Sequence, residues 1–241
     1  MVRLDWVYGM NIKVRIKFSK YGLMKFIGHL DVMRYFQKLL RRADIPVAYS
    51  TGMSPHQIMS FAMPLGIGLE SDAEYVDIEI TERIASDIAV KRLNEQNVEG
   101  IKVLSFRELP EGAVNAMASI KAADYEVSFS DAMAPDFSCF ETLKDMYEEP
   151  RISVLKKTKK NEMYVDIKPG IYGIWGNEER IGMCLSCGST LNIKPELVIK
   201  AVYDRLKIHM PEHALLIKRK EIYTETDGVR ISLDKIGDDI E

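Results

Sequence analysis

Two of the four histidines lie where an imidazole could act on a ligand. His29 follows Gly28 in the stretch FIGHLD, at the expected start of a helix, a position that favours the neutral, base-competent ring. His56 follows Pro55 in YSTGMSPHQIMSF, a polar loop of the kind that often carries ligand-contacting residues. The two rings could act as general acid and base, or each could stabilise the backbone beside it. The sequence favours a binding role for the pair over catalysis.

Basic residues gather in the first 60 positions, which hold ten Lys or Arg against three Asp or Glu. Residues 61–150 hold seven against nineteen, and the whole chain has a net charge of −3, so a local basic surface is expected rather than a general polyanion binder. Tyr21, Tyr35 and Tyr49 could stack on bases, although a solvated face is the simpler alternative. The candidates for phosphate contacts are Lys13, Arg15, Lys17, Lys25, Arg34, Lys38, Arg41 and Arg42.

A second anion site is suggested by GSTLNIKPE (188–196), a loop that runs into the expected start of a helix. The free N–H groups of a helix start favour an anion, and Asn192 and Lys194 could add contacts there. An ordinary capped helix explains the same pattern. The nearby basic cluster LKKTKKNE (155–162) is expected in an exposed hairpin or at a helix end.

The three cysteines are expected to be structural. Cys184 and Cys187 have the spacing of half a zinc or redox site, but no second pair completes it. In an alternating strand, residues three apart point to opposite faces. Neither GxxxxGKS, a dinucleotide fingerprint nor GxSxG occurs, so no cofactor or metal is expected. We expect reduced thiols and a cytoplasmic protein.

The elements that must position these residues follow a repeated order. Residues 11–19 alternate as a strand with a basic outer face, and a helix from Gly28 ends before Pro46. A loop with one or two short strands, a strand with an acidic outer face (73–82), a helix that Ser86 could cap and a strand (101–109) complete one β-α-β-β-α-β unit. The same order recurs over residues 124–225. This predicts an α+β fold with two tandem ferredoxin-like (split βαβ) domains.

The predicted boundaries are an N-terminal extension (1–10), a first domain (11–110), a linker (111–123), a second domain (124–225) and a loosely held acidic tail (226–241). No apolar run reaches the roughly 18 residues needed to cross a bilayer, so no membrane partner is expected.

The stretch from VRIKFSKYG to EYVDIEI (14–80) resembles the radical SAM-associated (radical SAM-linked) family, a domain of unknown function. The likeness lies in the HLD helix start, the basic helix end before PVAYS, the Pro55-His56 and SFA steps, and GSTLNIKPELVI, and it covers roughly residues 11 to 205. It implies a bacterial partner of a cobalamin-type radical SAM enzyme carried on a separate chain, and points to RNA as the substrate. The CxxxCxxC run of such enzymes is absent, so this chain does not carry that chemistry on its own.

The preferred hypothesis is a non-catalytic RNA-binding accessory that presents an RNA, either tRNA or rRNA, to that enzyme. Basic side chains would hold phosphate, and a recognition loop would be lined by His29, Asp31, Ser54, His56 and Ser60, with Asn192 and Lys194 as a further anion contact. Two alternatives stay open. One is a metal-independent ribonuclease that uses His29 and His56. The other is a protein-interaction module whose acidic middle third is the docking surface.

Overall fold

The computed structural model describes residues 11–157, 162–188 and 191–241, so the predicted extension 1–10 lies outside the described residues. The chain has a mixed α+β fold and divides into two compact units. Unit 1 takes in residues up to 67, 73–119 and 231–241, and unit 2 takes in 68–72 and 120–230.

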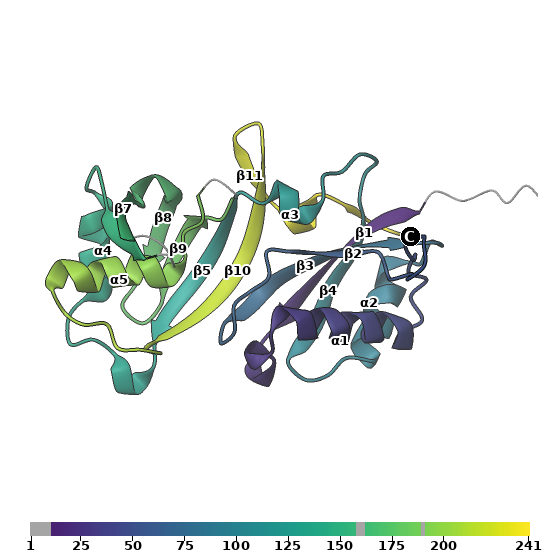
Figure 1. Ribbon diagram of the computed structural model, residues 1–241, viewed down its shortest axis with the longest axis horizontal. Coiled ribbons are helices and arrows are strands. Elements are labelled where there is room, and N and C mark those ends of the chain that lie inside the picture. Colours follow the sequence, from purple (N-terminus) through teal and green to yellow (C-terminus); the bar gives the residue numbers. More distant parts are fainter. Residues whose placement is uncertain (1–10, 158–161, 189–190) are drawn as a thin grey trace, which may run out of the picture. The chain divides into compact units, whose positions relative to one another are not determined.

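Unit 1 follows the predicted order of strands and helices. Its strand order is β12-β4-β1-β3, with β1 antiparallel to β4 and β2 antiparallel to β3 (Figure 1). The elements are β1 (Ile12–Lys20), α1 (His29–Arg42), β2 (Met59–Ala62), β3 (Glu70–Ile80), α2 (Ser86–Glu95), β4 (Ile101–Glu108), α3 (Ala116–Ser119) and β12 (Asp238–Asp239), with the 3₁₀ helices η1 (Gly22–Phe26) and η4 (Leu233–Lys235).

The core of unit 1 explains why its first helix docks on the sheet. Along β1, Ile16 and Phe18 are buried on one face by the two-residue repeat of a strand. In α1, Phe36 and Leu40 recur at helical spacing and join the same core cluster. The Phe18 and Phe36 rings lie 4.5 Å apart, which is close enough for a favourable aromatic contact.

The opposite face of β1 departs from the prediction of a solvated basic surface. Arg15 is only 2% exposed, because residues of α3 and of the C-terminal segment cover it. Its guanidinium donates to both Asp77 carboxylate oxygens at 2.7 and 3.0 Å. Asp77 also accepts from the Ala116 backbone N–H at 2.8 Å. The placement of Arg15 on an outer basic face is therefore wrong, as is an outer face for Asp77 and the buried Glu74.

The C-terminal segment is not loosely held. Asp238 and Asp239 pair with β4, and Leu233 and Ile240 are buried. The Ile240 backbone N–H donates to the Ser86 hydroxyl, which itself donates to the Phe106 carbonyl oxygen. Ser86 therefore ties the last residues to unit 1 instead of capping α2, whose N-cap is Ala85.

Unit 2 has the strand order β10-β5-β9-β8, with β11 beside β10 (Figure 1). Strand β3 begins in this unit, where Glu70 and Ser71 pair in parallel with β10. A separate hairpin, β6–β7, confirms the expectation for the basic cluster, whose residues 158–161 lie outside the described residues. The elements are β5 (Ala122–Phe129), α4 (Cys139–Tyr147), β6 (Ser153–Lys157), β7 (Glu162–Asp166), β8 (Ile171–Gly176), β9 (Ile181–Ser186), α5 (Pro195–Leu206), β10 (Leu215–Thr226) and β11 (Val229–Ser232).

Candidate functional site

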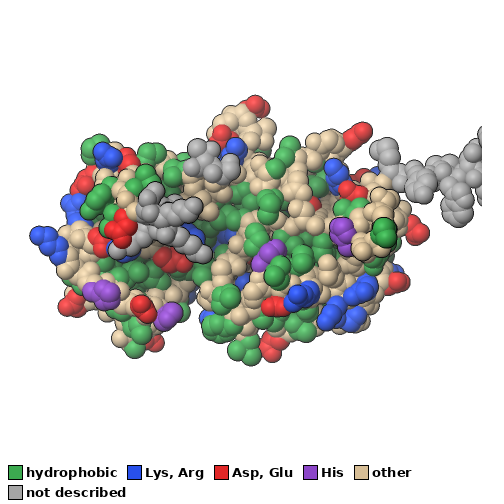
Figure 2. All heavy atoms as spheres, viewed as in Figure 1, with side chains coloured by type: hydrophobic (Ala, Val, Ile, Leu, Met, Phe, Trp, Pro, Cys, Tyr) green, Lys and Arg blue, Asp and Glu red, His purple; other side chains and the backbone are tan. Residues whose placement is uncertain are grey.

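The exposed side of α1 carries a continuous set of positive side chains. Arg34, Lys38, Arg41 and Arg42 are all exposed and are spaced at i, i+4, i+7 and i+8, so they share one side of the helix; they are called the cationic face below. The buried residues Phe36 and Leu40 project to the other side. Figure 2 shows Lys and Arg side chains gathered over the part of unit 1 where α1 runs. The amphipathic pattern that docks the helix therefore also turns its positive charges outward.

Acidic partners on α1 are few. Among the described residues, only Arg34 of the cationic face pairs with a carboxylate, that of Asp31 at 3.3 Å, and both side chains are more than 60% exposed. Arg41 donates to the Gln37 carbonyl oxygen at 3.2 Å, an interaction that leaves its charge in place. An exposed pair of the Arg34 type is worth at most about 1 kcal/mol, so it does not hold the guanidinium back from a ligand.

Tyr35 fixes one end of the cationic face. The guanidinium of Arg42 lies 5.9 Å from the Tyr35 ring centre and donates to the Gln96 carbonyl oxygen at 3.2 Å. The Tyr35 hydroxyl donates to Asn97 at 2.5 Å and accepts from the Val98 backbone N–H at 3.1 Å. Burial raises the pKa of Tyr35, while the Val98 bond and the Arg42 charge act in the opposite direction. The ring is thus part of the helix support and does not offer a free stacking surface.

Exposed apolar side chains stand at the N-terminal end of α1. Leu23 and Phe26 of η1 and Leu30 of α1 are 84%, 58% and 60% exposed, and they form what is called the apolar corner. The ammonium group of Lys25 lies 5.5 Å from the Phe26 ring centre. Leu23 and Phe26 were not singled out from the sequence. The sequence placed Leu30 on the apolar face of the helix with Phe36 and Leu40, and its 60% exposure shows that this placement is wrong.

His29 faces the core side of α1. It is half-buried, and its ring packs edge-to-face on Phe61 with centroids 5.3 Å apart. Phe36, seven residues later, contacts the same Phe61 ring at 5.6 Å. Helical spacing of 29, 33, 36 and 40 could have shown this, since these positions share one side. The structure therefore places His29 away from the cationic face.

His56 lies in an exposed loop and is held by the loop itself. The Ser50 hydroxyl accepts from the His56 backbone N–H at 3.1 Å and lies 2.8 Å from Nδ1. Nδ1 is also 3.4 Å from the carbonyl oxygen of Ser54. Among the described residues, no hydrogen bond or ring contact joins His56 to His29. The geometry gives no support to an acid–base pair.

Two other predicted residues line a small pocket of about 160 Å³ in unit 1. Lys13 and Ser60 lie there together with Glu79 and Asn115, and the Ser60 hydroxyl donates to the Asn115 side chain at 3.4 Å. Lys17 is half-buried, with its ammonium group 5.8 Å from the Tyr75 ring centre. These residues of β1 and β2 are therefore set in surroundings different from those of the cationic face.

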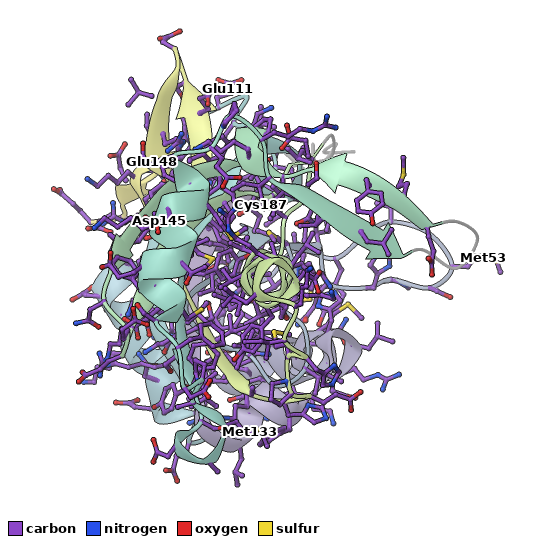
Figure 3. All side chains as sticks on the ribbon, turned by 90° about the vertical axis from the view of Figure 1, so that its left-hand side faces the viewer. Met53, Glu111, Met133, Asp145, Glu148 and Cys187 are labelled. Carbon is purple, nitrogen blue, oxygen red and sulfur yellow. The ribbon has the colours of Figure 1, made fainter. Side chains whose placement is uncertain are left out.

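Asn192 and Lys194 line a groove of about 1010 Å³ in unit 2. Figure 3 looks along α5, with α4, which carries Asp145 and is followed by Glu148, on one side and the β6–β7 hairpin on the other. The apolar wall of the groove is formed by Met146, Ile152, Leu155, Tyr164, Leu197, Ala201 and Met210. This groove was not predicted, because the residues that line it come from positions 146 to 210 and meet only in the fold.

Three of the four basic residues that line this groove are paired with acids. Lys200 donates to the Asp204 carboxylate at 2.6 Å, Arg205 forms an ion pair with Glu149, and Arg151 lies 3.9 Å from Asp166. Lys194 is exposed at the N-cap of α5. The groove is consequently an apolar surface with a nearly neutral rim.

The cysteines have no arrangement suited to chemistry. Cys139, Cys184 and Cys187 are buried free thiols, and desolvation is the main cause that raises each pKa from 9.0 to about 12. A thiol of this kind is a poor nucleophile and metal ligand. Among the described residues, no three His, Cys, Asp or Glu side chains are grouped to hold a metal ion, and no helix is long and apolar enough to cross a membrane.

Comparisons with known proteins identify a family whose description names no activity. Two solved structures have low similarity: an unknown protein from Galdieria sulphuraria (10% identity, TM-score 0.27, covering 87% of this chain and 97% of that chain) and a heavy metal efflux pump (9% identity, TM-score 0.24, 88% and 28%). This chain thus spans about a quarter of the pump. The search of curated proteins gives no match. The family model described as "Uncharacterized protein conserved in bacteria (DUF2344)" matches residues 13–195, and the chain belongs to that family.

Proposed function

We propose that this chain is a non-catalytic RNA-binding protein that uses the cationic face of α1. The observation that carries the proposal is the four exposed Arg and Lys side chains on one side of a single helix, of which only Arg34 pairs with a carboxylate among the described residues. Charges that no internal acid neutralises are available to phosphates, and contact with phosphate dominates RNA affinity.

The proposal extends to a partner and a substrate. The sequence likeness described above supports the role of an accessory that presents tRNA or rRNA to a cobalamin-type radical SAM enzyme on a separate chain. A cytoplasmic protein would meet both. Arg and Lys side chains at i, i+4 and i+7 reach about 10 Å along a helix, a span that matches two or three phosphates of one strand.

We also propose that the units are tandem ferredoxin-like domains. In unit 1 the order β4-β1-β3-β2, and in unit 2 the order β10-β5-β9-β8, follow from one β-α-β-β-α-β sequence of elements. The β6–β7 hairpin is then an insertion after the first helix of the second domain. Such folds carry many functions, so the assignment adds nothing to the argument for RNA.

The geometry favours binding over cleavage. A ribonuclease would need His29 and His56 to converge on one phosphodiester, whereas His29 packs on Phe61 and His56 bonds to Ser50. This difference in surroundings is the reason the RNA-binding role is preferred.

The test is a mobility shift of the purified chain with total bacterial small RNA at about 50 and about 200 mM salt, where phosphate contacts weaken strongly. Saturable binding that weakens with salt and leaves the RNA intact is expected. RNA that is shortened in a His56-dependent manner would establish the ribonuclease instead. No shift at either salt would leave the protein-interaction role.

A further inference from the structure

We infer that the RNA is held as an unpaired strand, with a base stacked on Phe26 of the apolar corner. This inference rests on the proposed function and names the form of RNA recognised. Its starting point is the exposure of Leu23, Phe26 and Leu30 within eight residues. Isolated exposed apolar residues are ordinary on a protein surface, whereas several together with one orientation mark a binding site.

Helical spacing pairs Leu23 with Phe26 and joins Leu30 to the cationic face. In a 3₁₀ helix, residues at i and i+3 eclipse, so Leu23 and Phe26 stand over one another on η1. Leu30 lies one helical turn before Arg34 on α1 and is its neighbour on the surface. The apolar corner is thus continuous with the positive charges, and a strand whose phosphates lie on the helix would bring its bases to the ring.

The corner is held firmly from below. The Tyr21 backbone N–H donates to the Gly100 carbonyl oxygen at 2.9 Å, and Met24 packs against the core of unit 1. Gly100 has φ +94°, and a side chain there would come within 2.6 Å of Met24 and 2.7 Å of the Tyr21 carbonyl oxygen. Only glycine therefore allows this close packing. With Met24 fixed inward, the backbone that carries Leu23 and Phe26 is already ordered, which lowers the cost of ordering on binding.

An unpaired strand is the form of polyanion that can use such a corner. In a duplex the base faces are already stacked, and the protein contacts mainly phosphates and sugar edges. A splayed base can stack on an aromatic ring whatever its identity, and a nearby cation strengthens the contact. The Lys25 ammonium beside the Phe26 ring meets that condition. A single nucleic acid strand carries one phosphate charge and one flat base at each nucleotide. It can therefore contact the cationic face and the apolar corner together, which an acidic protein surface does not do.

The test compares a labelled RNA of about 12 nucleotides, free and annealed to its complement, by fluorescence anisotropy at about 50 mM salt. We expect the single strand to bind at least about tenfold more tightly than the duplex. Phe26→Ala should weaken single-strand binding by about tenfold without changing duplex binding or the salt dependence. Phe26→Trp should retain the affinity, and Phe26→Leu should not, because only the ring can stack.

Ile67→Ala is the matched control, since Ile67 is 65% exposed in the same unit and lies outside the corner. Urea unfolding of each variant checks that the fold is intact. Equal affinity for single strand and duplex, unchanged by Phe26→Ala, would overturn this inference while RNA binding stands. Failure of both RNAs to bind would overturn the proposed function together with it.

Discussion

The two units treat their surface charges in opposite ways. On α1 of unit 1 the positive side chains lie together on one side, and among the described residues a single carboxylate, that of Asp31, pairs with them. In the groove of unit 2 three of the four positive side chains pair with acids, as Lys200 does with Asp204. The same residue types therefore produce an outward electrostatic field in one place and almost none in the other.

A positive side chain can bind phosphate only to the extent that no carboxylate of the protein already pairs with it. A cation that already has a close carboxylate gains little from a phosphate, because binding must first break or share the existing pair. Arg15 is the extreme case: it belongs to the same basic first 60 residues as Arg34, yet both of its close acidic contacts are with Asp77 inside the protein. Sequence charge counts treat these two arginines as equal, whereas the structure separates them.

The largest expected effect is on the buried pair. Asp77→Ala should lower the free energy of unfolding by about 3–5 kcal/mol, because the Arg15 charge is left buried and the Ala116 N–H loses its acceptor. Urea denaturation measures the change. Asp31→Ala removes an exposed partner of the same type and should cost at most about 1 kcal/mol. Equal losses for the two variants would show that burial does not distinguish these pairs.

The second prediction concerns the thiols, all three of which lie in unit 2. Burial raises the pKa of each thiol in the folded chain to about 12, whereas the ordinary thiol pKa is 9.0. The unfolded chain therefore loses these protons first, and stability should fall as pH rises from 9 through 12, by on the order of 1 kcal/mol per thiol at pH 10. The urea midpoint at pH 8 and pH 10 measures it.

The emission of Trp175 reports on unit 2 directly in a Trp6→Phe variant, because the chain has two tryptophans. Replacing the three cysteines by alanine should flatten the loss above pH 9. If the midpoint of the alanine variant falls as steeply as that of the parent chain, the thiols are not responsible.

Local sequence pattern predicted the elements well and their surroundings poorly. The repeat of Ile16 and Phe18 on β1 and of Phe36 and Leu40 on α1 indicated the strand, the helix and their contact, since each depends on a few neighbouring residues. The burial of Arg15 depends on α3 and η4, which lie about 100 and 218 positions away. The alternating pattern of a strand carries no information about distant segments that cover one of its faces. A covered polar face is therefore predicted to be exposed to solvent.

The candidate site divides in the same manner. The cationic face could be predicted because it is the polar side of one helix, and the direction of His29 could have been read from the same helix. The apolar corner could not, because Leu23 and Phe26 are apolar in sequence and only the tight packing of Met24 under Gly100 shows that they point outward. The C-terminal segment was predicted to be loosely held because it is rich in acidic residues. Its apolar residues Leu233 and Ile240 are nevertheless buried.

The third prediction tests the comparison of the two units directly. Replacing Arg34, Lys38 and Arg41 by glutamine should weaken RNA binding at least about tenfold at low salt and reduce the salt slope by about one per lost contact. Anisotropy over a salt series measures both. The matched variant replaces Arg151, Lys200 and Arg205 of unit 2 by glutamine, which removes the same charge from side chains that already pair with acids and should change affinity by less than about threefold. A larger loss from the unit 2 variant would reverse the proposed location of the RNA.

The smallest expected effect tests whether Tyr35 supports α1 or contacts RNA directly. Tyr35→Phe removes a hydroxyl that donates to Asn97 and accepts from the Val98 N–H, so the free energy of unfolding should fall by about 1 kcal/mol. The ring stays in place beneath Arg42, and RNA affinity should therefore be unchanged. Tyr35→Ala also removes the ring, which frees Arg42 to change position and should lower both stability and affinity. If Tyr35→Phe alone weakens binding, the hydroxyl itself contacts RNA, and the cationic face would have to include the side of α1 on which Tyr35 lies.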